Sequence, residues 1–349
     1  MTNTTKYRTL APGSINKKAI GLLSGGLDSA LAVKIMLDMG IEVIALNFFS
    51  PFCTCTSKKA GCKSEALKVA KKYGLKLKTT FLGEKYLAMI QYPKYGYGKN
   101  LNPCVDCRIM MFKEAKKIMI DEGASFIFTG EVLEQRPMSQ RNDTMNLIEK
   151  ESGLKGLIVR PLSAKLLKPA IPEINGIINR NHLLKIRGRS RKKQIALAEQ
   201  KGIHNYPCAA GGCLLTDFHF SNRLRDLYRF QNTITLNDAR MLRIGRHFRI
   251  NSQCKVISGR NKEENEKLEK LIQPRDIVFR VQGNKGSLVV ARGIMEKGVM
   301  ETISSIAAHY SQAPKSTKIP VEIREFPDQN ISLQKACSVD EMIIKNFVI

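Results

Sequence analysis

The sequence predicts an α/β fold, doubly wound around a mainly parallel sheet, followed by a smaller α+β C-terminal domain. Short, unalternating apolar runs, typical of strands covered on both faces, alternate with amphipathic helical stretches through the first half of the chain. From about residue 235 this alternation gives way to shorter strand-like runs. We therefore expect a disordered or loosely packed lead-in over residues 1–17 and two domains, over residues 18–232 and 233–349.

The first predicted strand, residues 19–23, runs into a glycine turn. Ser24 is followed at once by Gly25 and Gly26, and an apolar-rich helix begins near Ser29. The two glycines permit positive φ angles and a close approach of the backbone to a ligand, and a helix N-terminus beneath such a turn binds anions. Because no lysine follows the glycines, Walker and dinucleotide motifs fit poorly. The turn therefore predicts a phosphate site, with an ordinary glycine-rich βα turn as the alternative.

The remaining elements follow in alternation. Ligands on a doubly wound sheet bind at the carboxyl ends of its strands, so we expect Asn47, at the end of the second strand, to flank the nucleotide beside Ser24. The expected strands span residues 42–49, 75–81, 126–131, 156–159, 276–282 and 287–292, and the expected helices residues 62–73, 108–122 and 194–201, with a further helix that ends near residue 272.

The composition indicates a polyanionic partner. Lys and Arg number 57 against 31 Asp and Glu, a formal charge of +26, which is far more than solubility requires. We expect nucleic acid and no membrane, because no apolar run approaches the roughly 20 residues that span a bilayer. Residues 1–18 are polar and contain no signal core, which favours the cytoplasm. Nine cysteines in that compartment are expected to be thiols or metal ligands.

Cys104 and Cys107 form a C-x-x-C pair just before or at the start of a predicted helix. A helix N-terminus favours thiolates there, and zinc, a redox pair, an iron–sulfur cluster and two plain thiols are the competing interpretations. A metal needs at least a third cysteine from elsewhere. Cys213, next to two glycines whose amides can approach a cluster, is our first candidate, and Cys208 is the second.

Three further cysteines, Cys53, Cys55 and Cys62, follow the second strand. Their spacing fits no common four-ligand zinc site, so they are either a metal or sulfur-handling set or reduced thiols in a loop. Cys254 and Cys337 have no partners by spacing and are treated as plain thiols.

Basic residues gather in three places. Two arginines follow the strand over 126–131, six Lys or Arg lie within residues 185–193, and arginines recur at every third position from 240 to 249. For the first group, phosphate contact and a solvated charged loop carry similar weight. For residues 185–193 phosphate contact is favoured over a solvated face, and the arginines from 240 to 249 fit a single charged stripe that faces a phosphate backbone. The residues expected to contact RNA are Arg136, Arg141, Arg187, Arg189, Arg191, Arg243, Arg246 and Arg260.

Several motifs together resemble a known family. The string Ser24–Ser29 resembles the pyrophosphate loop of ATP pyrophosphatases, the PP-loop proteins with an adenine nucleotide hydrolase-like fold. With Thr129-Gly130-Glu131, Gln135, Ser139-Gln140 and Arg160-Pro161-Leu162, it resembles the tRNA 4-thiouridine synthases and related tRNA thiolation enzymes. Asn102-Pro103-Cys104-x-x-Cys107 is similar to the cluster-binding motif of members that use an iron–sulfur cluster. The resemblance covers about residues 18–220.

A second resemblance concerns the C-terminal domain. Gly259-Arg260-Asn261, followed by Asn265, is similar to the RNA-binding domain of the fibronectin-binding-like (NFACT) proteins. The 4-thiouridine synthases carry an RNA-binding extension before the pyrophosphate loop, whereas this chain begins almost at the loop. We therefore expect RNA to be captured C-terminally.

These resemblances imply an ATP-dependent RNA sulfurtransferase, with tRNA the favoured substrate. The enzyme would adenylate a uridine carbonyl oxygen and replace it with sulfur from a [4Fe-4S] cluster on Cys104, Cys107 and Cys213, supplied by a sulfide or persulfide donor. Mg²⁺ is expected near Asp28, and Arg136, Arg141 and Lys165 are candidates for stabilising phosphate charge. The implied ATP-binding residues are Ser24, Gly25, Gly26, Asp28, Ser29, Asn47, Gly130 and Lys165.

Two other functions stay open at this stage. One is a PP-loop ATPase that amidates or otherwise activates a small molecule and holds zinc on its cysteines. The other is a non-catalytic RNA-binding protein. The sequence also leaves open the RNA and base that are modified, position 2 or 4 of the base, and a homodimer.

Overall fold

A computed structural model describes residues 16–54, 62–204, 206, 213–328 and 330–349. Its internal contacts divide the chain into two units. The N-terminal unit comprises Met1–Leu82, Tyr92–Gly98 and Asn102–Cys213, and the C-terminal unit Gly83–Gln91, Lys99–Leu101 and Leu214–Ile349. Within the described ranges, no helix is long and apolar enough to cross a membrane. Most of the predicted lead-in lies outside these ranges.

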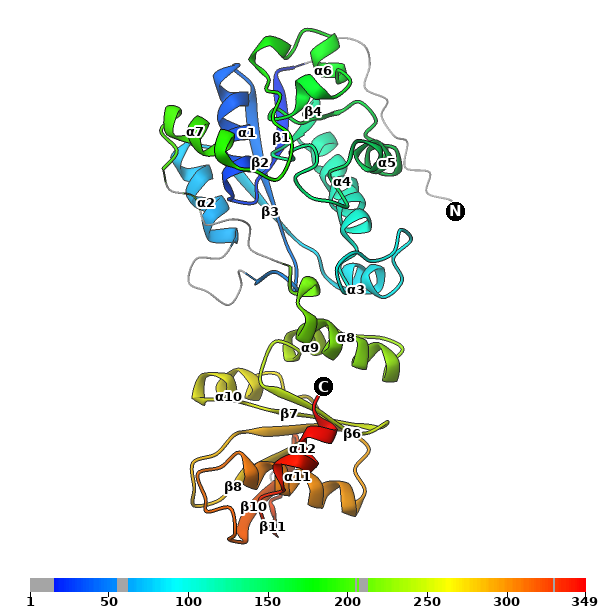
Figure 1. Cartoon of the computed structure of the whole chain (residues 1–349), viewed down its shortest axis with the longest axis vertical. Helices are drawn as coiled ribbons and strands as arrows, with labels where there is room; N and C mark the ends of the chain where they lie inside the picture. Colours follow the sequence, from blue (N-terminus) through cyan, green and yellow to red (C-terminus); the bar gives the residue numbers. More distant parts are fainter. Residues whose placement is uncertain (1–15, 55–61, 205, 207–212, 329) are drawn as a thin grey trace. The chain divides into compact units, whose positions relative to one another are not determined.

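The N-terminal unit is built on a five-stranded sheet of order β3-β2-β1-β4-β5 whose paired strands all run parallel (Figure 1). The strand register pairs Ile20 with Ile44 on one side and with Ile127 on the other. The central strand β1 is apolar on both faces, as the sequence predicts. The strands are β1 (Lys18–Leu22), β2 (Glu42–Phe49), β3 (Lys76–Phe81), β4 (Phe126–Thr129) and β5 (Ile158–Val159).

Helices cover both faces of this sheet (Figure 1). On one face α1 (Leu27–Asp38), α2 (Cys62–Lys72) and α7 (Lys192–Gln200) enclose a core that includes Leu31, Val43 and Phe126. On the other face α4 (Cys104–Asp121) and α5 (Asn142–Ser152) pack over Ile20, Leu46 and Ile127. The predicted doubly wound α/β fold is therefore confirmed. Between β5 and α7 lie η2 (Ala164–Leu166), α6 (Ile171–Ile174) and η3 (Arg180–His182).

The C-terminal unit contains a mixed α+β fold on an antiparallel sheet of order β11-β10-β8-β9-β7-β6. One face packs on α11 (Lys297–His309), and the other on apolar residues of α9 (Leu236–Met241) and α10 (Lys262–Glu269). The strands are β6 (Arg246–Asn251), β7 (Cys254–Ser258), β8 (Ile277–Val281), β9 (Val289–Gly293), β10 (Ile319–Glu325) and β11 (Ser332–Ala336). The unit also contains α3 (Glu84–Gln91), η4 (Leu214–Thr216), α8 (Phe218–Phe230) and α12 (Glu341–Phe347).

The expected single stripe of arginines over residues 240–249 is wrong. Arg240 lies in α9, whereas Arg246 and Arg249 lie in β6. A spacing of three matches the period of one helix face but not that of a strand, where alternate residues share a face. The four arginines therefore do not form one surface.

Candidate nucleotide and thiol site

The turn after β1 holds its hydroxyl groups close together. The Ser29 hydroxyl donates to the Gly26 carbonyl oxygen at 2.9 Å, and its oxygen lies 3.2 Å from that of Ser24. The Asn47 side chain donates to the Leu23 carbonyl at 2.7 Å and so fixes the end of β2 against the end of β1. The predicted proximity of Asn47 to Ser24 follows from this bond.

Two glycines are required here by close packing. Gly25 has φ of +80°, and a Cβ atom at this position would lie 2.5 Å from the Glu65 Cβ. Gly130, at the end of β4, abuts the start of α1 so closely that a Cβ would lie 2.5 Å from the Asp28 and Ser29 backbone. The glycine of the Thr129-Gly130-Glu131 motif therefore lets β4 approach the phosphate turn.

Asp28 presents a partly buried carboxylate at this turn. Its Oδ2 accepts from the Gln135 side chain at 3.1 Å, and Oδ1 has no partner among the described residues. Burial raises the pKa of Asp28, although Gln135, Arg191 and Gln194 oppose the shift. A carboxylate oxygen without a partner beside a helix N-terminus suits a cation such as Mg²⁺ carried by a nucleotide.

Other buried polar atoms near Asp28 also lack partners within the described ranges. Asn47 Oδ1 is one, Arg191 Nε is another, and neither amide atom of the fully buried Gln194 has a hydrogen bond. Buried polar groups in native proteins are nearly always paired, so such a group of unpaired atoms indicates a place for a bound ligand or water. The donors and acceptors fit a nucleotide.

Arg136 links this turn to the thiols. Burial lowers the pKa of Arg136, and the nearby positive charge of Arg108 adds to this shift. Cys104, Glu131 and Asp28 oppose the shift without reversing it. The charges of Asp28 and Cys104 therefore both act on the Arg136 guanidinium. A cation in this position can stabilise phosphate charge.

Cys104 and Cys107 lie in the first turn of α4. The Asp106 carboxylate between them accepts from the backbone N–H groups of Lys94 and Tyr95, at 2.9 and 3.1 Å. This ties the preceding loop to the turn that presents the two thiols. The predicted placement of the C-x-x-C pair at a helix N-terminus is confirmed.

The Arg160-Pro161-Leu162 motif is a buried structural element. Arg160 donates from Nε to Glu131 at 3.1 Å and also pairs with Glu149, and the side chains of Arg160 and Glu131 are each only 3% exposed. Burial would raise the pKa of Glu131, but Arg108 and Arg160 outweigh it and lower the pKa. This ion pair fixes the end of β4 relative to β5. The exposed Lys165 donates to the Asn181 carbonyl at 2.8 Å, and its expected role at ATP stays a prediction.

Cys213 lies opposite a cysteine from the loop after β2. An isolated antiparallel bridge pairs the backbones of Cys213 and Cys53. Across the described part of the chain, no three His, Cys, Asp or Glu side chains form a group that could hold a metal ion. Cys55 and Cys208, and the side chain of Cys62, lie outside what the structure describes. The three-cysteine metal set thus stays a prediction.

The arginines expected to bind RNA in the N-terminal unit have varied surroundings. Arg187 pairs with Glu134 through Nε at 2.6 Å, and Arg141 lies 3.4 Å from Asp143. Arg189 is exposed. The charge of Arg191 opposes the rise in the pKa of Asp28.

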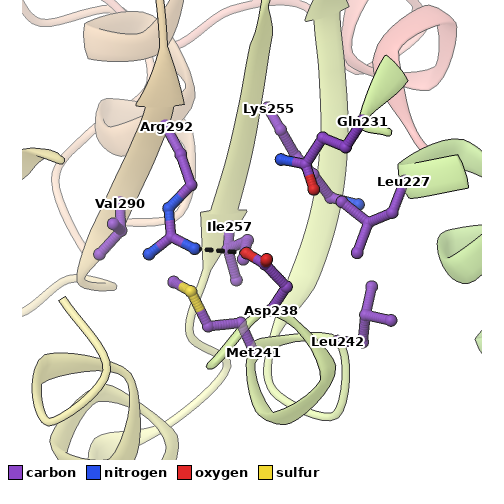
Figure 2. A pocket seen from close by; sticks show the side chains of 9 residues that line it. All are labelled: Leu227, Gln231, Asp238, Met241, Leu242, Lys255, Ile257, Val290 and Arg292. Carbon is purple, nitrogen blue, oxygen red and sulfur yellow. Dashed lines mark hydrogen bonds and ion pairs between the residues drawn. The ribbon is translucent and has the colours of Figure 1, made fainter. Parts of the chain in front are cut away.

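The C-terminal unit has a small pocket between α8, α9 and the sheet (Figure 2). Apolar side chains line most of it, with Lys255 and Arg292 among its charged groups. Arg292 donates to Asp276 through Nε and Nη2, each at 2.8 Å, and to Asp238 through Nη1 at 2.6 Å. Lys255 donates to Asp226 at 3.0 Å. These charges are thus already paired within the protein.

The remaining predicted RNA-binding residues lie around this sheet. The Arg246 guanidinium lies 4.4 Å from the Tyr310 ring centre, and the exposed Arg260 is 3.4 Å from Glu264. Arg243 lies between α9 and β6. The motif that suggested the second resemblance has a structural role: Asn261 caps α10, and Asn265 accepts from the Leu288 backbone at 3.0 Å.

Sequence reasoning missed Gln194 and assigned no contact to Gln135. Gln135 follows the Thr129-Gly130-Glu131 motif, which is a usable signal. Gln194 follows a basic run at the start of a helix, where a glutamine is unremarkable. Only the packing of α7 on α1 brings it near Asp28.

Comparisons with known proteins agree with both resemblances. Residues 14–175 match the family model described as thiamine biosynthesis protein (ThiI), and residues 245–348 match the NFACT protein RNA binding domain. The two resemblances predicted from the motifs are therefore confirmed.

The curated relatives match only part of their own length. The tRNA-specific 2-thiouridylase MnmA of Leptospira interrogans is 33% identical over 125 residues, which cover 31% of this chain and 33% of the relative. A protein of a Thermoanaerobacter species named "Probable tRNA sulfurtransferase" is 37% identical over 125 residues, covering 36% of this chain and 32% of that protein. The chain thus spans about a third of the length of these relatives.

Solved structures align less closely. A 4-thiouridine synthetase–RNA complex with bound ATP aligns with 53% of this chain and 53% of its own at 22% identity, with a TM-score of 0.34.

Proposed function

We propose that this protein is an ATP-dependent RNA sulfurtransferase that acts on a uridine of tRNA. The observation that supports this best is the phosphate turn, where a buried Asp28 carboxylate oxygen has no partner among the described residues, in the same unit as the C-x-x-C pair at the start of α4. Nucleotide activation and sulfur transfer need their reacting groups in one place. The match of residues 245–348 to the NFACT protein RNA binding domain, and the partial matches to relatives named for tRNA thiolation, favour RNA as the substrate.

In the first step the base is activated. ATP would lie with its phosphates against Ser24–Ser29 and the N-terminus of α1, and Asp28 would hold the Mg²⁺ that neutralises them. The uridine carbonyl oxygen attacks the α-phosphorus, and pyrophosphate leaves. Arg136 and Arg191 stabilise the developing phosphate charge. The base must be flipped out of a helix or presented in a loop to reach this site.

In the second step sulfur replaces oxygen. A sulfur nucleophile held near Cys104 attacks the activated carbon, and AMP leaves with the former carbonyl oxygen. The adenylate matters because it converts a poor oxygen leaving group into a good one. Arg136 remains near the phosphate of the departing AMP.

We further propose that Cys104, Cys107 and Cys213 hold a [4Fe-4S] cluster. The donors suit it, since two thiols occupy the first turn of α4 beside a cation. When bound, three-cysteine ligation leaves one iron able to carry a sulfide from the donor. Anaerobic purification followed by iron and acid-labile sulfide analysis tests this part separately.

The test of the activity uses the full chain with ATP, Mg²⁺, a sulfide source and unmodified tRNA. We expect tRNA-dependent release of pyrophosphate and a thiolated uridine in the digested tRNA, detected by mass spectrometry. Asp28→Asn should lower the rate on the order of 100-fold, because the neutral amide holds Mg²⁺ poorly. Asp121→Asn, which changes an exposed carboxylate at the end of α4, is the matched control and should leave the rate unchanged. Pyrophosphate release that ignores RNA would contradict the proposal.

A further inference from the structure

Two cysteines far apart in sequence lie opposite each other in the N-terminal unit. The isolated bridge between Cys53 and Cys213 is antiparallel. Directly opposed residues in an antiparallel pair have Cα atoms about 4.5–5.5 Å apart, with side chains on the same face. A disulfide needs Cα atoms about 4.4–6.8 Å apart. The backbone therefore places these two cysteines at a separation that a disulfide can close.

Cys53 is also held in position by its own turn. The Ser50 backbone N–H donates to the Cys53 Sγ at 3.3 Å, and the Ser50 hydroxyl oxygen lies 3.5 Å from the same sulfur. That hydroxyl oxygen accepts from the Phe52 N–H at 3.2 Å, so its own proton is available to the sulfur. Phe52 is fully buried and anchors the turn. These contacts fix the position of the Cys53 sulfur, which is one of the two sulfurs that the proposed exchange joins.

We propose that Cys53 and Cys213 form an oxidation-sensitive dithiol that regulates the sulfur-transfer site. A low-molecular-weight disulfide, such as oxidised glutathione, is the oxidant. The Cys53 thiolate attacks it, forms a mixed disulfide and releases one glutathione thiolate. The Cys213 thiolate then attacks the Cys53 sulfur, forms the Cys53–Cys213 disulfide and releases the second glutathione. Two electrons pass from the two cysteines to the oxidant.

The consequence of this reaction rests on the proposed function. A Cys213 sulfur bound in a disulfide can neither ligate a metal nor carry a transferable sulfur. Oxidation thus switches off sulfur transfer reversibly and spares Cys213 from irreversible oxidation.

Other thiols provide contrasts within the same chain. Burial raises the pKa of the Cys254 thiol to about 11, so this residue should react slowly. Cys104 and Cys107 are the rival dithiol, because a C-x-x-C pair at a helix N-terminus is also oxidised readily. The partly exposed Cys337, in the C-terminal unit, serves as a thiol without a role in this mechanism.

The test maps disulfides in the full-length, metal-free protein. The protein is treated with oxidised glutathione, blocked with N-ethylmaleimide, digested with trypsin and analysed by mass spectrometry without reduction. The relevant peptides, 35–58 and 202–223, also carry Cys55 and Cys208, so matched variants are needed. We expect a link between the peptides that persists in Cys55→Ser, Cys208→Ser and Cys337→Ser but disappears in Cys53→Ser.

Two results would overturn the proposal. One is Cys213 joined to Cys104 or Cys107. The other is Cys53 bound to glutathione while Cys213 is recovered with N-ethylmaleimide.

A second measurement tests the regulatory consequence. After treatment with oxidised glutathione, wild-type protein should lose tRNA thiolation and regain it with dithiothreitol, whereas Cys53→Ser should keep most of its activity. If oxidised wild type and oxidised Cys53→Ser lose activity equally, the regulatory role is wrong. If no form of the protein thiolates RNA, the proposed function fails, and the peptide map still decides the dithiol.

Discussion

Buried polar groups at the phosphate turn differ in their pairing from the buried charges beside the pocket of the C-terminal unit. At the carboxyl edge of the parallel sheet, polar atoms of Asp28, Asn47 and Gln194 are buried and have no partner among the described residues. Around the pocket of the antiparallel sheet, by contrast, Arg292 and Lys255 are bonded to carboxylates of the same unit. Unpaired buried groups cost stability unless a ligand completes them, and paired ones support the fold. The first arrangement therefore indicates a ligand site. The second, the ion pairs of Arg292 and Lys255 with their carboxylates, supports the fold, and we call it the framework.

The largest expected effect tests the framework. Arg292→Met leaves Asp238 and the 2%-exposed Asp276 without their cation, and should lower the free energy of unfolding by about 3–5 kcal/mol. Urea unfolding followed by circular dichroism measures the change. Arg280→Met, which removes a half-exposed partner of Glu269, is the matched control and should cost no more than about 1 kcal/mol. Equal losses in the two variants would contradict the distinction between framework and surface charges.

The next prediction concerns the pH dependence of the same framework. Burial lowers the pKa of Lys255 to about 8. The unfolded chain keeps this proton up to about pH 10.4, so it binds more protons than the folded chain between the two values. The free energy of unfolding should therefore rise from about pH 8 to about pH 10.4, by at most about 3 kcal/mol. Below pH 8 the folded chain carries the full cost of burying the charged Lys255 amine. Hydrogen exchange of the β7 and β9 amides, corrected for intrinsic rates, measures it.

Replacing the amine isolates its contribution to that rise. Lys255→Met should flatten the rise, because no amine remains to lose a proton. Lys262→Met, at a lysine that is 93% exposed, should retain it. A rise that survives in Lys255→Met would assign the effect to another group.

A third prediction tests the packing beneath the nucleotide site. In Gly130→Ala the new Cβ would meet the Asp28 and Ser29 backbone at 2.5 Å, so the start of α1 must shift. We expect a loss of about 1–3 kcal/mol in stability together with weaker ATP binding. Thermal unfolding and ATP titration measure the two effects. Gly298→Ala is the control, since nothing lies within 4 Å of its Cβ, and full ATP affinity in both variants would count against a site at this turn.

The smallest expected effect sharpens the comparison most. Gln194→Leu removes a buried carboxamide that has no hydrogen bond to the described residues, so the ligand-free protein should be unchanged or slightly more stable. ATP binding should weaken about tenfold, because the ligand loses its hydrogen bonds to the Gln194 carboxamide. Calorimetric titration and thermal unfolding give both values. A destabilised variant with unchanged ATP affinity would place Gln194 in the framework.

The local parts of the site could be predicted from the sequence, whereas its assembly could not. The turn at Ser24–Ser29 and the C-x-x-C pair at the start of α4 are adjacent residues whose types limit their conformation. Gln194 escaped prediction because its role depends on α7 packing against α1. The pairing of Cys53 with Cys213 joins segments 160 residues apart in the chain, and no local pattern marks it. The prediction of one arginine stripe over residues 240–249 was wrong because a spacing of three residues places side chains on one face only within a helix, and this segment contains a helix and a strand.

The bonds from Asp106 to the backbone of Lys94 and Tyr95 offer a spectroscopic handle. The chain contains no tryptophan, so Tyr95→Trp would introduce a single indole fluorophore. Both bonds involve backbone N–H groups, which the substitution preserves. The emission of this indole would report, in real time and without a label, whether the turn that carries Cys104 and Cys107 keeps its position when ATP or RNA is added.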